Sequence, residues 1–200
     1  KPMILSVGTA SIGEVADAVE AARDGGCTDL TLLACTSSYP AKPEDANLLR
    51  IPALAEIFNV KVGLSDHTLG IGVAVAAVAL GATVIEKHVT LRRADGGVDS
   101  AFSLEPEELK ALVDECNAAY VARGSAHVWT TKAETESLRL RPSLYVTRSV
   151  KAGELITHEN VRSVRPAGGL PPKDLPLVIG RHFAQDAEVG TPVEWSLIND

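Results

Sequence analysis

The chain has 200 residues and a mass of 21.0 kDa, and 46% of its residues are hydrophobic and 22% charged. These fractions are those of an ordinary globular protein, and they exclude a disordered, collagen-like or disulfide-built chain. The net charge of −7 argues against a nucleic-acid partner held through its phosphates, so we expect none.

The cysteines and the most apolar segment bear on the compartment. Cys27, Cys35 and Cys116 form no C-x-x-C pair, so neither a disulfide framework nor a zinc ribbon is predicted, and a reducing cytoplasm fits best. The apolar stretch over residues 71–80 is about half as long as the roughly 20 residues that cross a bilayer. It predicts a buried helix and no membrane association.

Four strand–helix units are predicted in succession. The expected strands span residues 3–7, 30–34, 60–64 and 83–86, and the helices that follow them span residues 11–25, 46–58, 70–80 and 106–122. Strands that are apolar on both faces and alternate with helices predict a parallel sheet covered by helices.

Polar residues cluster just after the end of each predicted strand. The clusters are Ser6, residues 36–39, residues 65–68 and residues 87–88. No G-x-G-x-x-G motif follows a strand, so a dinucleotide-binding sheet is not indicated. In a (β/α)8 barrel the carboxyl ends of the strands form the catalytic face. The pattern therefore favours part of a TIM barrel over a doubly wound sheet, since four units cannot close eight strands.

A change of composition after residue 124 predicts a second domain. Residues 125–142 are polar and are expected to be a linker. Residues 143–200 carry short strand patterns, at 143–147, 161–164 and 192–195, separated by turn residues. They predict a small, mostly β domain that, at about 58 residues, buries too little surface to be independent of a larger partner.

His67 and His88 are the sharpest candidate ligands, because each follows one of two consecutive strands in the same phase. Neighbouring strands lie about 4.8 Å apart, so both imidazoles could reach one divalent cation and leave positions open for substrate and water. The alternative is two hydrogen-bonded histidines near the edge of the core, since two ligands without a third are a weak metal signal. Asp66 and Glu86 could orient the imidazole N–H groups or bond to nearby backbone.

Hydroxyl groups would surround the same edge of the sheet. Ser6, Ser37, Tyr39 and Ser65 could donate hydrogen bonds to a phosphate or carboxylate, and turn formation at strand ends is the alternative for each. Lys87 should point to the face of the sheet opposite that of Glu86 and His88, where we expect it to pair with a helix.

Two loops carry the remaining candidates. The Gly-bearing loop over residues 92–99 is expected to be flexible and to place Asp99 near sugar hydroxyls, or to leave it as one more exposed charge. The Pro- and Gly-rich turn over residues 164–172 presents Arg165 for bidentate capture of a substrate group. A plain surface arginine is the alternative.

Several segments together resemble the sialic acid synthase family. They are residues 1–6 (KPMILS), 33–40 (LACTSSYP), 62–68 (VGLSDHT), 85–88 (IEKH) and 99–103 (DSAFS). The sequences of residues 37–40 and 96–103 most resemble those of the pseudaminic acid synthase branch. The last 58 or so residues resemble the antifreeze-like SAF domain, a β-clip fold, including its Arg-Pro-x-Gly-Gly turn at residues 165–169. The resemblance implies the C-terminal half of a TIM barrel in residues 1–124, followed by the linker and a SAF domain in residues 143–200.

The resemblance also implies a reaction. Such enzymes condense phosphoenolpyruvate with an N-acylated amino sugar, here of the 6-deoxy-2,4-diacetamido-altrose type, and water to give pseudaminic acid and phosphate. His67 and His88 match the family's Mn²⁺ or Mg²⁺ ligands and, with Glu86, its catalytic groups. The residues that match its phosphoenolpyruvate contacts are Ser6, Ser37, Tyr39 and Ser65.

Further implications concern the sugar and the assembly. Glu86 and Asp99 match positions that meet the sugar and the ion, and Arg165 matches the residue that the SAF domain inserts into the partner subunit's barrel. A domain-swapped homodimer is thereby implied.

The resemblance leaves alternatives open. N-acetylneuraminate and legionaminic acid synthases use the same catalytic groups and are alternative functions. A non-catalytic sugar-binding module is the alternative outside the class of enzymes. The family's first barrel half, with substrate-binding lysines and acidic residues, would lie upstream of Lys1. We therefore expect the 200 residues alone to be inactive, because an open half-barrel exposes two strand edges and an unfinished pocket.

Overall fold

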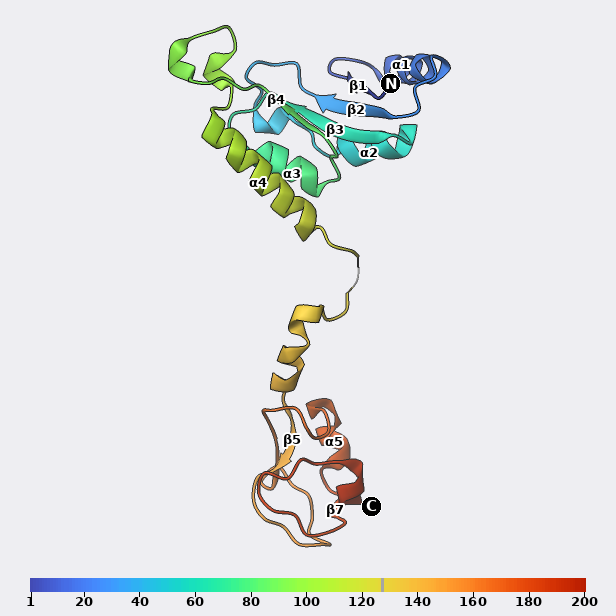
Figure 1. Ribbon diagram of the computed structural model, residues 1–200. Helices are drawn as coiled ribbons and strands as arrows, with labels where there is room; N and C mark the ends of the chain where they lie inside the picture. The colour runs from blue at the N-terminus through green and yellow to red at the C-terminus, as the bar shows by residue number, and fades with distance from the viewer. Residues whose placement is uncertain (127) are drawn as a thin grey trace. The chain divides into compact units, whose positions relative to one another are not determined.

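The computed structural model describes residues 1–126 and 128–200, and the chain divides into two compact units, residues 1–126 and 127–200 (Figure 1). Each unit has its own hydrophobic core. The predicted linker, residues 125–142, includes residue 127, which lies outside the described residues. Its described part contains two 3₁₀ turns, Lys132–Glu134 and Glu136–Leu140. In the described part of the chain, no helix has the length and hydrophobicity needed to cross a bilayer.

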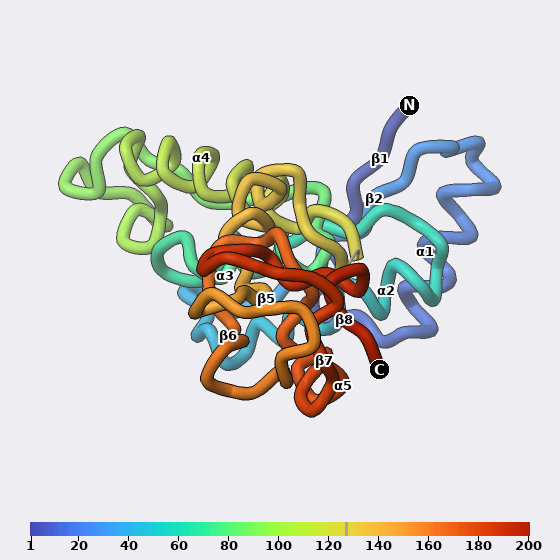
Figure 2. The backbone as a smooth tube through the Cα atoms, turned by 90° about the horizontal axis from the view of Figure 1, so that it is seen from below, coloured from blue at the N-terminus to red at the C-terminus, as the bar shows by residue number. Residues whose placement is uncertain are grey.

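The first unit repeats strand and helix four times. Its strands are β1 (Met3–Ser6), β2 (Leu30–Cys35), β3 (Lys61–Asp66) and β4 (Ile85–Lys87), and its helices are α1 (Ile12–Asp24), α2 (Arg50–Phe58), α3 (Gly72–Ala79) and α4 (Pro106–Ala122). The strands form one parallel sheet in the order β1-β2-β3-β4, and Figure 2 shows β1 beside β2. The predicted α/β class is confirmed.

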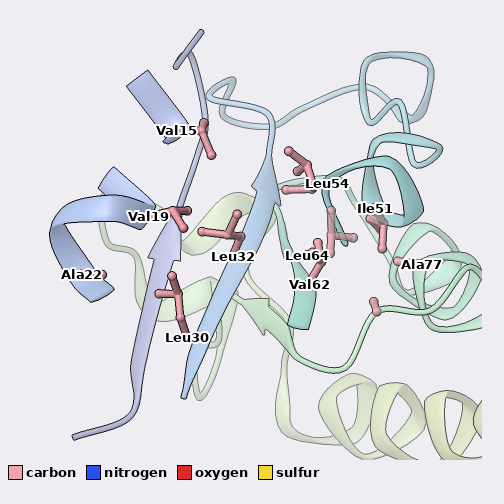
Figure 3. Packing of buried hydrophobic residues seen from close by; sticks show 12 residues of the cluster. Val15, Val19, Ala22, Leu30, Leu32, Ile51, Leu54, Val62, Leu64 and Ala77 are labelled. Carbon is pink, nitrogen blue, oxygen red and sulfur yellow. The ribbon is translucent and has the colours of Figure 1, made fainter. Parts of the chain in front are cut away.

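The core of this unit is formed by side chains on one face of the strands. Leu32 of β2 and Val62 and Leu64 of β3 pack in one cluster with Val19 of α1 and Ile51 of α2 (Figure 3). A doubly wound sheet is covered by helices on both faces, whereas a barrel sheet carries its helices on the outer face only. The one-sided core is that of a barrel segment.

The start of α1 follows its local sequence signal, whereas the start of α2 does not. At α1, the Glu14 N–H donates to the Ser11 hydroxyl at 3.3 Å while the Ser11 N–H donates to the Glu14 carboxylate at 2.8 Å, a capping box. Helix α2 begins at Arg50 and not at residue 46, because residues 43–45 form a 3₁₀ turn and Asn47 has a left-handed φ of 43°. Strand β4 likewise begins two residues later than predicted.

The second unit consists of short strands joined by turns. β5 (Ser143–Val146) pairs antiparallel with β6 (Val161–Val164), β7 (His182–Phe183) pairs antiparallel with β8 (Ile198–Asn199), and α5 spans Leu175–Val178. The strand predicted at residues 192–195 is reduced to an isolated antiparallel bridge between Pro192 and Tyr145, and a 3₁₀ turn begins at Trp195. The segment before that turn is nevertheless tied to β5, since the Val193 N–H donates to the Leu144 carbonyl at 2.9 Å. The core of this unit contains Leu144, Val146, Ile156, Val161, Val178, Phe183 and Val193.

Gly63 is required by the close approach of β3 to its neighbours. A Cβ atom at this position would lie 2.3 Å from the Val84 carbonyl oxygen and 2.7 Å from Leu33 Cδ2. The first of these is a backbone atom, which cannot rotate away. The tight contact brings β3 against the segment that leads into β4, so it helps to set the spacing of the two strands that precede the histidines.

We predict that Gly63→Ala destabilises the first unit by about 1–3 kcal/mol, the range for overpacking a well-packed core. Urea unfolding followed by circular dichroism at 222 nm measures this, because helices α1 to α4 all belong to the first unit. Gly13→Ala is the matched control, since a Cβ there meets nothing within 4 Å. Equal midpoints for the two variants would contradict the account.

Candidate functional site

The candidate site lies at the carboxyl ends of β3 and β4. The strands pair Ser65 with Glu86 and Asp66 with Lys87. The residue that follows the end of each strand is a histidine. The imidazole rings of His67 and His88 have centroids 5.3 Å apart and planes inclined at 67°. The structure therefore brings together the two side chains that the sequence singled out.

The orientation of His67 is fixed by a backbone carbonyl. Its Nδ1 lies 2.8 Å from the carbonyl oxygen of Thr36, in the loop after β2. Because a carbonyl oxygen only accepts hydrogen bonds, Nδ1 must carry a proton. In the neutral ring Nε2 then holds a lone pair. The carbonyl of His67 in turn accepts the Ala41 N–H at 2.9 Å, which ties the same loop to the strand end.

His88 is held in a comparable way by the loop before α4. Its Nδ1 lies 3.5 Å from Asp99 Oδ2, and its carbonyl accepts the Leu104 N–H at 2.9 Å. Its side chain is about one-third exposed, at 32%. Nδ1 of each imidazole thus lies near an oxygen, at hydrogen-bond distance from the Thr36 carbonyl for His67 and at ion-pair distance from Asp99 for His88.

Two aromatic rings enclose the histidine pair. Tyr39 packs against His67 with centroids 4.3 Å apart, and its centroid lies 6.0 Å from that of His88. Phe102 contacts His88 edge-on at 5.1 Å. Tyr39 is itself exposed. Its ring covers part of the site and remains open to a ligand.

Ser65 and Glu86 form a cross-strand hydrogen bond on the histidine face. The buried Ser65 hydroxyl donates to Glu86 Oε1 at 2.6 Å, and its oxygen lies 3.5 Å from His67 Nε2. Glu86 is exposed. Its carboxylate is therefore held in place by Ser65 and accessible to a substrate.

Ser6 and Ser37 lie at the same edge of the sheet without joining this cluster. Both are exposed, at the end of β1 and in the loop after β2. A Cβ at Gly8 would lie 2.6 Å from the Ser37 hydroxyl oxygen, so the two loops touch. In the described part of the chain neither serine hydrogen-bonds to the histidine pair.

Arg165 belongs to the second unit, so its role toward the first unit stays a prediction. It is exposed on a turn that the buried Ser143 holds. The Ser143 hydroxyl donates to the Pro166 carbonyl and accepts the Gly169 N–H, both at 3.0 Å. Gly169 is needed there, because a Cβ would lie 2.2 Å from the Leu144 carbonyl oxygen.

Lys87 forms a buried ion pair with Asp66, and the predicted pairing with a helix is wrong. The Lys87 ammonium lies 2.7 Å from Asp66 Oδ2 and 2.5 Å from the Thr68 carbonyl, with side-chain exposures of 3% and 1% for Lys87 and Asp66. Asp66 Oδ1 accepts the Thr68 N–H and hydroxyl at 2.9 and 2.8 Å. Of the two alternatives for Asp66, the structure thus shows bonding to nearby backbone, and among the described residues Asp66 forms no hydrogen bond to an imidazole.

The donor set fits a divalent cation held by two protein ligands. Metal-bound histidines usually donate their other N–H to a carbonyl or carboxylate. The Thr36 carbonyl is such an acceptor for His67, and the Asp99 carboxylate lies 3.5 Å from Nδ1 of His88. Ligand bonds of about 2.1 Å from two Nε2 atoms are compatible with rings 5.3 Å apart. Among the described residues no group of three or more His, Cys, Asp or Glu side chains is placed to hold a metal ion.

The loop that carries Asp99 is anchored to the start of α4. Arg93 forms an ion pair with Glu108, and its backbone N–H donates to Glu105 at 2.8 Å. The hydrogen bond from Arg93, followed by that from the Glu105 N–H, lowers the pKa of Glu108. The same ion pair raises the pKa of Arg93. The loop expected to be flexible is thus pinned at its base.

The sequence patterns indicate no role for Thr36, Phe102 or Arg93. Thr36 acts through its backbone carbonyl, which no side-chain pattern reveals. Phe102 and Arg93 lie in segments that were already singled out, on either side of Asp99. The charge pattern of Arg93 with Glu105 and Glu108 was the signal that could have identified the anchor.

Comparisons with known proteins agree on a family. The model described as the NeuB family matches residues 1–128, and the model described as the SAF domain matches residues 141–199. A pseudaminic acid synthase of Campylobacter jejuni is 41% identical over 98% of this chain and 57% of its own length. An N,N'-diacetyllegionaminic acid synthase of the same species is 40% identical over 85% of this chain and 52% of its own.

A solved structure shares the fold. The N-acetylneuraminic acid (sialic acid) synthetase of Leptospira borgpetersenii, crystallised with citrate, superposes with a TM-score of 0.64 at 39% identity, over 68% of this chain and 48% of that one. The chain spans little more than half the length of the curated relatives that it matches over nearly its whole length.

The Arg93–Glu108 anchor predicts a pH dependence. Because the folded-state pKa of Glu108 lies below its ordinary value of 4.5, the pair stabilises the fold above that pH, and the contribution is lost as pH falls through the folded-state pKa. Glu108→Gln should therefore lower the urea midpoint of the first unit at pH 7, and the difference from the unmodified chain should shrink below pH 4.5. Glu107→Gln, on the same helical turn, is the control for the helix-terminal charge. Identical behaviour of the two variants would refute the anchor.

Proposed function

Because the chain belongs to the NeuB family, we propose that its first unit supplies part of the active site of a synthase that joins phosphoenolpyruvate to an N-acylated amino sugar. In this reaction C3 of phosphoenolpyruvate bonds to the aldehyde carbon of the open-chain sugar. Water adds at C2, and inorganic phosphate leaves. The product is a nine-carbon acid of the sialic acid type.

The observation that carries the proposal is the pairing of His67 and His88 at the carboxyl ends of adjacent parallel strands, beside Glu86 and Asp99. In a barrel this end of the sheet carries the chemistry. Two neighbouring imidazoles, next to two carboxylates, suit a divalent cation and a polyhydroxylated substrate. Lys87 adjoins Glu86 and His88 in the chain, but its charge is already neutralised by a buried carboxylate.

We assign His67 and His88 as the protein ligands of this cation. Imidazole ligands favour Mn²⁺ over Mg²⁺, because Mg²⁺ prefers oxygen donors. When bound, the cation would polarise the sugar aldehyde and supply a site for the attacking water. The Thr36 carbonyl prepares the site by holding the Nδ1 proton of His67 away from it, and the Asp99 carboxylate lies near Nδ1 of His88.

The other side chains have roles set by their exposure. Glu86, fixed by Ser65 and open to solvent, accepts a hydrogen bond from a sugar hydroxyl or from the water that adds at C2. Tyr39 covers His67 with its ring and offers its hydroxyl to the phosphate or carboxylate of phosphoenolpyruvate. Ser6 and Ser37 extend the row of donors along the strand ends.

Within the family, the proposal is the pseudaminic acid branch. The segments at residues 37–40 and 96–103 favour this branch, and pseudaminic acid synthases of Campylobacter jejuni are 41% and 42% identical. The legionaminic relative, at 40%, is nearly as similar. Sequence identity therefore does not distinguish the two branches, and an assay of the sugar substrate does.

We propose that residues 143–200 act as the SAF domain of this enzyme. Arg165, exposed on its Ser143-held turn, would reach the site of a partner subunit in a cytoplasmic, domain-swapped homodimer. Such a role needs a rigid turn, because an arginine held in place loses less side-chain entropy on binding a substrate group.

We predict that the chain binds one Mn²⁺ and that His67→Ala or His88→Ala weakens the affinity at least tenfold, because loss of a group that merely supports a metal ligand already costs about tenfold or more. The measurement is the loss of the electron paramagnetic resonance signal of free Mn²⁺ on titration. His158→Ala, an exposed histidine of the second unit, is the control and should bind normally. Sugar binding that is indifferent to both substitutions, without Mn²⁺ binding, would instead favour a non-catalytic sugar-binding module.

A chimeric enzyme tests the reaction itself. The part of the Campylobacter jejuni pseudaminic acid synthase that precedes its match to this chain is fused to residue 1. We predict phosphate release from phosphoenolpyruvate with 6-deoxy-2,4-diacetamido-altrose, and none from the 200-residue chain alone. His67→Ala should abolish turnover. A preference for the neuraminic or legionaminic sugar precursor would move the protein to that branch, and a folded chimera inactive with all three would refute the proposed function.

A further inference from the structure

An ion pair stands where the strand pattern calls for apolar residues. Val62 and Leu64 of β3, and Ile85 of β4, face the helix-side core, and strand alternation places Asp66 and Lys87 next in the same phase. The serine, the glutamate and the two histidines of the candidate site belong to the opposite phase. The pair therefore lies behind the strands, on the far side from the candidate site, and does not face a substrate.

Stability alone does not explain a buried ion pair in this position. Burying two charges costs hydration, and well-packed apolar residues of similar size often serve as well or better. An ion pair differs from apolar side chains because it is lost when the two strands are out of register. A slip of β4 by one residue along β3 would separate the two charges and leave each buried without its partner, whereas apolar side chains would tolerate the slip.

The network around the pair fixes the backbone next to both histidines. Asp66 precedes His67 and Thr68 follows it, and both are joined to the Lys87 ammonium, at 2.7 and 2.5 Å. Asp66 also accepts the Thr68 N–H and hydroxyl, which closes the turn around His67. Lys87 directly precedes His88. In the described part of the chain, no buried side-chain nitrogen or oxygen lacks a hydrogen bond.

We propose that the Lys87–Asp66 ion pair is what holds His67 and His88 side by side, so that Lys87 is a positioning residue for the cation site. The inference rests on the proposed function for the use of the site. The geometric part, the alignment of the two rings, is independent of it.

The double variant Asp66→Asn/Lys87→Met separates positioning from stability. Asn keeps an oxygen for the Thr68 N–H and Met keeps the length of the lysine stem, while both charges are removed. Lys87→Met alone should lower the urea midpoint, because it leaves Asp66 buried and unpaired. The double variant should recover most of that loss. The control is Asp29→Asn/Lys61→Met, the same change in an exposed ion pair of 2.9 Å.

The readouts are Mn²⁺ affinity and the nuclear Overhauser effect between the ring protons of His67 and His88. In the double variant we expect affinity to fall at least tenfold, in the range for groups that support ligands, and the ring–ring signal to weaken. The control should change neither. A double variant that keeps both affinity and signal would overturn the proposal, because the pair would then be structural only.

Two further outcomes remain decisive. If the unmodified chain binds no Mn²⁺, the proposed cation site fails, and the ring–ring signal alone tests the positioning role. If the double variant does not fold, Lys87→Arg replaces it, since the planar guanidinium keeps the charge but not the geometry of the ammonium. A weakened ring–ring signal in Lys87→Arg supports the proposal, and an unchanged one overturns it.

Discussion

The parallel register of β3 and β4 is the constraint on which the site depends. Pairing Ser65 with Glu86 and Asp66 with Lys87 sets two cross-links at the strand ends, one on each face of the sheet. The one on the site face holds a carboxylate in reach of solvent, and the one behind it is buried. Since side chains alternate along a strand, this single alignment also decides that the two imidazoles meet.

The loops complete what the register begins. Each histidine carbonyl accepts an N–H from its own loop, from Ala41 for His67 and from Leu104 for His88. These bonds bring an aromatic ring onto each imidazole, that of Tyr39 on the first and that of a phenylalanine on the second. The same loops supply the backbone carbonyl and the carboxylate that face each Nδ1. The fold thus sets the position and enclosure of both rings, and the tautomer of His67, through separate contacts.

The sequence allowed the repeating units and the histidine pair to be predicted, because both are short-range patterns. Apolar runs marked the strands, and equal phase after two consecutive strands marked the two histidines. The Lys87–Asp66 pair was missed because its partners lie 21 residues apart and meet only through the register. The Thr36 carbonyl belongs to the backbone, so no residue type announces it. The predicted start of helix α2 is too early, because Asn47 fits the helical pattern of the sequence but adopts a left-handed conformation.

The chain belongs to the NeuB family, matches the SAF domain over residues 141–199, and is similar to a pseudaminic acid synthase of Campylobacter jejuni. We have proposed that His67 and His88 bind one cation between them. Anomalous X-ray diffraction from crystals grown with Mn²⁺ locates such an ion. We expect a peak within bonding distance of both Nε2 atoms. A well-ordered site with no peak there, or with the ion on only one of the rings, would contradict it.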